Sequence, residues 1–350
     1  MSHLGRVFLL AFAVGLASLW PSLAYSQLEA LPPIDEPHVG RLAAPSAVPG
    51  SAPITSSESI GQGIAQETTA WEHTATRRWG GFSALEPRDD PRFAAGDDWT
   101  WQILPAGLVY RAYLAGVKES RLASIWTTDL QSGGIWDITL GGRVGILRYG
   151  NQNPFFPKGW QLDLEGAATP RLIPSQQRDL AASDYRAGVP LTYSGGPWEY
   201  KFGYYHLSSH LGDEFMIRHP GFPRLNFSRD CLVFGVAYRP VPDVRLYFEP
   251  AWGFYVDGGS KPWEFQFGID IAPAAPTGWQ GGPFLALNGY LRQQLNFSGN
   301  FVAQCGWSWR GTQGGHLFRV GFEFYNGKSR QFSFYSRFEQ QLGLGLWYDF

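Results

Sequence analysis

The residues of this chain best suited to chemistry lie where histidines and serines alternate with large aromatic residues. Residues 198–210 read WEYKFGYYHLSSH, and a period of two is typical of a β-strand, whose side chains point to opposite faces in turn. His206 and Ser208 therefore project from one face, two residues apart. A histidine beside a serine is how a general base activates a hydroxyl nucleophile, with a third polar group orienting the imidazole.

The face that carries this pair is aromatic, as expected for a strand that meets lipid. It consists of Trp198, Tyr200, Phe202, Tyr204, His206, Ser208 and His210. The next predicted strand, 225–239, has an apolar face whose parity Asn226 shares. We therefore expect His206, Ser208 and Asn226 to face lipid near the ends of two adjacent strands. Placing an imidazole and a hydroxyl against lipid is costly unless the groups bond each other or serve a function.

The run YYHLS, residues 204–208, resembles the Tyr-x-His-x-Ser motif of outer-membrane phospholipase A and the barrel lipid A deacylases. In those families the histidine and the serine lie on the outside of the barrel, facing the outer leaflet. The resemblance implies that Ser208 is the nucleophile, that His206 is its base, and that Asn226 is the third member on the following strand. It also implies a lipid substrate.

A cofactor follows from the same resemblance. The adjacent loop contains Asp213 and Glu214, which would help to hold the calcium ion that the phospholipase uses. The chain departs from those families after Ser208, where they have Asn-Gly or Asn-Ala and this chain has Ser209-His210. The spacing from Ser208 to Asn226 also differs, so the third role stays open between Asn226 and Glu214. The local resemblance covers about 60 of the 350 residues.

Taken as a whole, the chain resembles an uncharacterised family of exported bacterial proteins, known only as a domain of unknown function. Residues 205–214, YHLSSHLGDE, are the core of that resemblance. The family has no established activity, so the His–Ser pair is open between catalysis and contact with lipid headgroups in the interfacial belt. We do not expect a metal shared by His206 and His210, because residues i and i+4 of a strand lie about 13 Å apart.

The last residues of the chain predict the element that positions this pair, a membrane barrel. From Leu342 to Phe350 the larger apolar residues mostly fall on every second position. An unpaired apolar edge of a soluble sandwich, the alternative, invites aggregation, whereas a closed barrel pairs its last strand with its first. The ending resembles the signature by which bacterial outer-membrane barrels are recognised, so we expect the barrel assembly machinery to bind the C-terminal strand.

The N-terminal residues predict export to the bacterial outer membrane. Arg6 precedes the apolar run 7–20, and small residues near Ser26 suit a signal peptidase, which predicts a signal peptide over 1–26. Residues 27–98 are rich in Pro, Ala, Ser and Gly, and we expect a flexible periplasmic segment there. No later stretch has about 18 consecutive apolar residues, so strands would have to cross the membrane.

The remainder, 99–350, predicts an all-β, transmembrane antiparallel β-barrel of about twelve strands. Thirteen candidate strands are separated by turn residues, which is one too many for an even-stranded barrel. Either 104–114 is a lead-in segment or one of the other early strands is wrong. The candidates are 104–114, 119–129, 134–148, 158–170, 183–194, 197–210, 225–239, 243–256, 261–272, 282–294, 299–310, 315–326 and 338–350.

The composition supports a barrel and excludes some partners. Aromatic residues make up 16% of the chain and there are 43 glycines, unlike a helical protein. The net charge of −2 indicates no nucleic acid partner. The two cysteines, Cys231 and Cys305, are open between one disulfide and two separate thiols. The oligomeric state is not indicated.

Three functions fit these observations. The first is a hydrolase acting on acyl esters of outer-leaflet lipid, with Ser208, His206 and Asn226 clustered on the outer face. The second is a channel for small solutes, which requires an open lumen. The third is a structural envelope protein, which requires neither. The sequence slightly favours the first.

Overall fold

The computed structural model describes residues 98–312 and 314–350. The predicted signal peptide, 1–26, and the predicted flexible segment up to residue 97 lie outside the described residues. Within them, no helix is both long enough and apolar enough to span a membrane.

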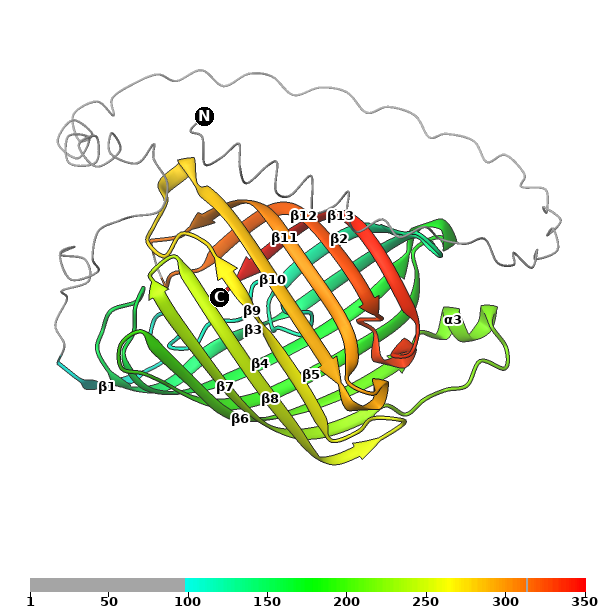
Figure 1. Cartoon of the computed structure of the whole chain (residues 1–350), viewed down its shortest axis with the longest axis horizontal. Helices are drawn as coiled ribbons and strands as arrows, with labels where there is room; N and C mark the ends of the chain where they lie inside the picture. Colours follow the sequence, from blue (N-terminus) through cyan, green and yellow to red (C-terminus); the bar gives the residue numbers. More distant parts are fainter. Residues whose placement is uncertain (1–97, 313) are drawn as a thin grey trace, which may run out of the picture. The chain divides into compact units, whose positions relative to one another are not determined.

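Twelve antiparallel strands close into a barrel, because the last strand, β13, pairs with the first strand of the ring, β2 (Figure 1). The predicted fold is therefore confirmed, and the C-terminal strand pairs as its apolar alternation predicted. The ring consists of β2 (Leu122–Asp129), β3 (Gly133–Gly150), β4 (Gly159–Ile173), β5 (Asp179–Ser194), β6 (Trp198–Leu211), β7 (Ser228–Val241), β8 (Val244–Asp257), β9 (Trp263–Ile271), β10 (Gly282–Arg292), β11 (Ser298–Arg310), β12 (Leu317–Lys328) and β13 (Phe338–Asp349).

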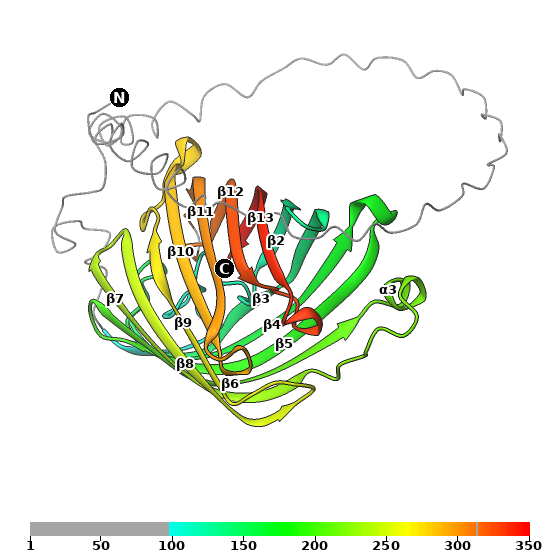
Figure 2. The same cartoon turned by 45° about the vertical axis from the view of Figure 1, so that its right-hand side comes forward.

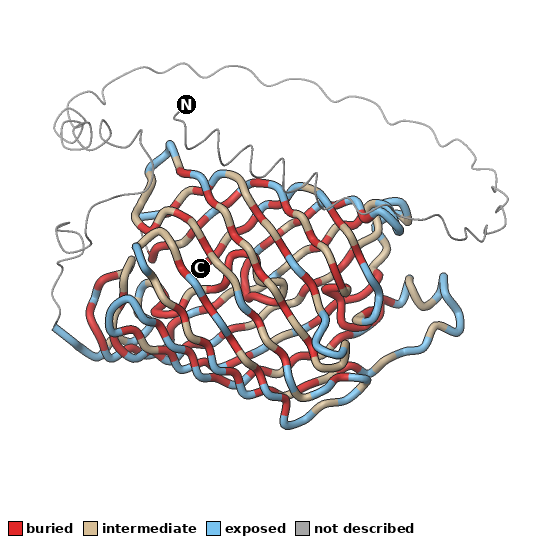
Figure 3. Tube along the Cα trace, in the orientation of Figure 1, coloured by how far each residue is buried: buried red, intermediate tan, exposed pale blue. Residues whose placement is uncertain are grey.

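Side chains alternate between outward-facing and lumen-facing positions along these strands, which is why the sequence forms a barrel of the outer-membrane type. On β13, Leu342 and Leu344 are 61% and 52% exposed, whereas Glu339 and Gln341 are buried in the lumen. Figure 3 shows the same alternation of buried and exposed positions around the barrel wall. These two leucines thus face outward, and the two polar side chains face the lumen.

The predicted strand 104–114 is wrong as a strand of the barrel, and the lead-in alternative is correct. A short strand, β1 (Thr100–Ile103), pairs with the end of β3, and residues 104–121 then cross the lumen (Figure 2). This lumen segment needs no neighbouring strand, because lumen arginines satisfy its carbonyl groups. Arg121 donates to the carbonyl oxygens of Leu114 and Tyr113, and Arg245 donates to that of Arg111.

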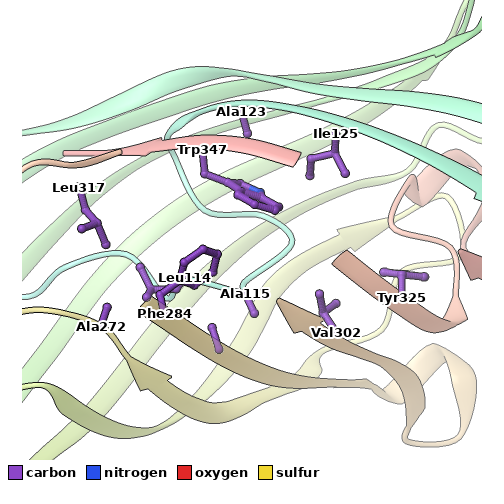
Figure 4. Close-up of a cluster of buried hydrophobic side chains, with 11 residues drawn as sticks. Leu114, Ala115, Ala123, Ile125, Ala272, Phe284, Val302, Leu317, Tyr325 and Trp347 are labelled. Carbon is purple, nitrogen blue, oxygen red and sulfur yellow. The ribbon is translucent and has the colours of Figure 1, made fainter. Parts of the chain in front are cut away.

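Apolar side chains of the lumen segment pack against the inner wall of the barrel. Leu114 and Ala115 lie in a cluster with Phe284 and Trp347, which come from β10 and β13 (Figure 4). The Tyr113 ring stacks on that of Tyr247 at 3.9 Å. The apolar residues that suggested a strand are therefore buried in the lumen rather than placed in the wall.

A loop from the opposite end of the barrel also enters the lumen. Residues 329–337 join β12 to β13 and include the 3-10 turn η4 (Phe332–Phe334). Phe332 is fully buried, with its ring 4.9 Å from that of Phe227 and beneath the ammonium group of Lys118. The inward loop and the lumen segment therefore meet inside the barrel.

Ion pairs bind the strands to one another across the lumen. Arg171 contacts Asp137 at 2.7 Å and Glu339 at 2.5 Å, and Arg319 contacts Asp349 at 2.8 Å. One polar cavity between the lumen segment and the wall has a volume of about 20 Å³, room for a single water molecule. The lumen segment and the inward loop thus occupy part of the lumen. Cys231 and Cys305 are free thiols on β7 and β11.

Candidate active site

Two neighbouring strands, β6 and β7, position the predicted site on the outward face of the barrel. Their antiparallel register places His206 opposite Asp230 and Ser208 opposite Ser228. Outward positions on β6 alternate with buried lumen positions, as the aromatic face of the sequence predicted. Ser208 and His206 therefore share the outward-facing side of β6, near its C-terminal end.

A histidine–carboxylate pair lies at the centre of this site. His206 Nδ1 lies 2.9 Å from Asp230 Oδ1, and the Tyr204 hydroxyl donates to the same oxygen at 2.6 Å. The side chains of His206 and Asp230 are 43% and 23% exposed, so a ligand reaching the outer wall can contact them. Because Nδ1 is bonded to the carboxylate, Nε2 is the ring nitrogen left to accept a proton.

Ser208 lies two residues further along β6, on the same face as His206. A rise of about 3.3 Å per residue sets their Cα atoms about 6.6 Å apart, within reach of a hydrogen bond once both side chains turn toward each other. Tyr185 on β5 and Ser228 on β7 flank Ser208 across the sheet. The serine is half-buried among these neighbours.

Asn226, which the sequence offered beside Glu214 for the third role, lies in the chain before β7. Its amide contacts Asp257 Oδ2 at 3.4 Å. The residue that contacts His206 is Asp230, which the sequence reasoning missed. A signal for Asp230 was present, because it shares the outward parity of Leu232 and is an acid where lipid is expected.

The predicted calcium ligands lie in the loop that follows β6. Asp213 and Glu214 occupy the first turn of a short helix, α3 (Asp213–Arg218), and both are exposed. Calcium takes six to eight oxygen ligands. Across residues 98–312 and 314–350, no group of three or more His, Cys, Asp or Glu side chains is arranged to hold a metal ion. Two carboxylates alone therefore fit only part of such a site.

The lumen face of β6 anchors the site strand to the interior. The Ser209 hydroxyl donates to Asp184 Oδ1 at 2.5 Å and contacts the Ser333 hydroxyl of the inward loop at 2.7 Å. Asp184 also pairs with Lys118 of the lumen segment at 2.5 Å. Burial lowers the pKa of Lys118, although the charge of Asp184 opposes that shift. These lumen contacts thus fix the strand whose outward face carries His206 and Ser208.

A family described as "Protein of unknown function (DUF1207)" matches residues 104–350, which include every strand of the ring. No curated protein matches the chain. Similar solved structures include outer membrane phospholipases and porins.

Outer membrane phospholipase A from Escherichia coli is 13% identical with a TM-score of 0.42, covering 65% of this chain and 89% of that one. The Salmonella typhi outer membrane phospholipase dimer with bound calcium is 12% identical with a TM-score of 0.43, covering 65% and 90%. The KdgM porin is 11% identical with a TM-score of 0.35, covering 65% and 99%. At these identities and scores the likenesses say nothing about activity.

Proposed function

We propose that this chain, which belongs to the DUF1207 family of proteins of unknown function, is an outer-membrane hydrolase of lipid acyl esters. The observation that carries the proposal is the contact of His206 with Asp230 on the lipid-facing wall, beside Ser208. An acid, a base and a hydroxyl in this order are the parts of an acyl-transfer site. Lipid is the substrate class, because the outer wall is otherwise apolar.

In the proposed reaction, His206 Nε2 takes the proton from the Ser208 hydroxyl as its oxygen attacks the ester carbonyl. The tetrahedral intermediate collapses when His206 returns the proton to the leaving alcohol. Water, deprotonated by the same nitrogen, then attacks the acyl-serine carbonyl, and His206 returns the proton to the Ser208 oxygen as the fatty acid leaves. Asp230 holds Nδ1–H and stabilises the imidazolium that forms in each step.

Whether the proposed hydrolysis requires calcium is a question for experiment. Asp213 and Glu214 offer carboxylate oxygens, which calcium prefers, but too few of them to complete a site among the described residues. We therefore derive no step from the ion. The barrel assembly machinery remains a proposed partner of β13, and the outer membrane the proposed location.

The test is acyl-ester hydrolysis by the full chain refolded in detergent, with calcium or with a chelator. We expect hydrolysis by the wild type and at least a thousandfold loss, on the order of that seen for other catalytic serines, in Ser208→Ala. Ser228→Ala is the matched control, because Ser228 faces outward directly opposite Ser208. Heat-modifiable gel mobility confirms folding.

Two results would contradict the proposal. A folded wild type that hydrolyses no lipid ester in either condition leaves the barrel as a structural protein. Equal activity in the wild type and Ser208→Ala assigns the hydrolysis to another group. The channel hypothesis is not favoured, because buried residues of the lumen segment and the inward loop occupy the lumen of the described barrel.

A further inference from the structure

We infer that Tyr204 is a positioning residue of this site, whose hydroxyl orients the Asp230 carboxylate and thereby fixes the tautomer of His206. The inference rests on the proposed hydrolase function for its kinetic consequence. Its structural part concerns one shared oxygen atom, Asp230 Oδ1, which accepts a hydrogen bond from both Tyr204 and His206.

The ring of Tyr204 is held in place by its neighbours on two strands. It stands opposite Leu232 of β7 in the sheet register, and its ring centroid lies 6.2 Å from that of Phe254 on β8. These contacts fix the position of the hydroxyl next to Asp230. The 2.6 Å distance is that of a charge-assisted hydrogen bond, which is about twice as strong as a neutral one.

The carboxylate of Asp230 needs such a restraint because the torsion that rotates a carboxylate is broad and roughly two-fold. On an apolar outer wall, water is scarce and cannot replace a missing donor. With Tyr204 and His206 converging on Oδ1, that oxygen is kept facing Nδ1. The proton of neutral His206 then stays on Nδ1, and the lone pair of Nε2 is free for Ser208.

Tyr200 is a second tyrosine on this strand, and it has no carboxylate to orient. It lies on the same face of β6 and is similarly exposed, with its ring centroid 6.3 Å from that of Tyr193 on β5. It stands opposite Val236 of β7, which offers no carboxylate. Tyr200 therefore has the strand face and the exposure of Tyr204 but lacks its contact with a carboxylate, and it serves as the control for Tyr204.

The kinetic test compares Tyr204→Phe with Tyr200→Phe, since both remove one hydroxyl and keep the ring. Loss of a hydrogen bond to a charged group predicts a fall of about tenfold in kcat for Tyr204→Phe, with KM changed by less than about twofold. Tyr200→Phe should leave both constants unchanged. Equal kinetics in the two variants, or a loss confined to KM, would overturn the inference.

A second measurement does not depend on activity. Nitrogen-15 NMR of protein labelled at histidine reports which ring nitrogen carries the proton, and His206→Gln identifies the signal. We expect Nδ1–H in the wild type and in Tyr200→Phe, and a mixture with Nε2–H in Tyr204→Phe. An unchanged tautomer in Tyr204→Phe refutes the positioning role even if lipid is hydrolysed. The expected tautomer change in a protein without hydrolysis supports that role while refuting the proposed function.

Discussion

A carboxylate on the outer wall of a barrel must find hydrogen-bond donors, and Asp230 has two of them. Charged groups facing lipid are costly, so their presence marks either a function or a pairing that offsets the cost. The pairing here involves a histidine, whose free ring nitrogen lies on the side of the wall that carries Ser208. An interfacial tyrosine or serine alone would not require an acid at this position.

The identity of the third catalytic member can be tested by two alanine variants. Asp230→Ala removes the carboxylate that contacts His206, and we expect kcat to fall by about a thousandfold, as when other triads lose a member. Asn226→Ala removes a side chain that contacts Asp257, and we expect activity within about twofold of the wild type. The hydrolysis rates of the two variants in detergent show which of the two residues is the third member. A large loss in Asn226→Ala with little loss in Asp230→Ala would instead assign the third role to Asn226, as the sequence predicted.

The His206–Ser208 pair could be predicted from sequence because parity along one strand is a local property. The partner of His206 could not, because it depends on the register between β6 and β7. The loop between them contains α3, and its length does not reveal whether Asn226 or Asp230 stands opposite the histidine. A shift of two residues keeps the same face and changes the partner.

Among the elements, the inward loop 329–337 is joined to the site strand through the lumen. Its backbone N–H groups at Phe332 and Ser333 donate to Asp184 and to the Ser209 hydroxyl. Phe332 also lies 4.9 Å from both the Lys118 ammonium and the Arg292 guanidinium. The loop is thus part of the core of the barrel.

Removing the Phe332 ring tests this role of the loop. Phe332→Ala leaves a cavity among Phe227, Tyr290 and two cations, and we expect the free energy of unfolding to fall by about 3–5 kcal/mol. Phe332→Leu retains most of the apolar volume and should cost less than about 1.5 kcal/mol. Urea titration of the refolded barrel in detergent measures both. An equally small loss in the two variants would show that the loop is not packed as described.

The strands of the ring could be predicted nearly to their ends, because turn residues separate runs with a period of two. Residues 104–114 could not be assigned with the same rules. Tyr110 and Leu114 fall on even positions, as in a strand, but they pack against lumen side chains that include Tyr247 and Trp347, far away in the sequence. Apolar residues at every second position indicate that one side of a segment is buried. They do not distinguish a strand of the barrel wall from a segment inside the barrel.

At the scale of the whole molecule, two segments of the chain occupy the lumen of the barrel. Twelve strands enclose a space that side chains can fill, and here the lumen segment and the inward loop meet at Lys118 and Phe332. Charged residues of the wall pair with one another rather than line an aqueous path. Any exchange with small ligands is therefore expected on the outside of the barrel.

The contact of the lumen segment with the inward loop gives an expectation for planar-bilayer recordings. The wild type should show no steady ohmic conductance, because the lumen segment and the inward loop each block the path. Replacing residues 108–117 with a Gly/Ser linker of equal length, or deleting 331–334, should leave the other obstruction in place and the bilayer sealed. Only the combined variant, with folding confirmed by gel mobility, should give discrete openings. Steady conductance in the wild type would contradict a closed lumen, and would favour transport over chemistry on the outer wall.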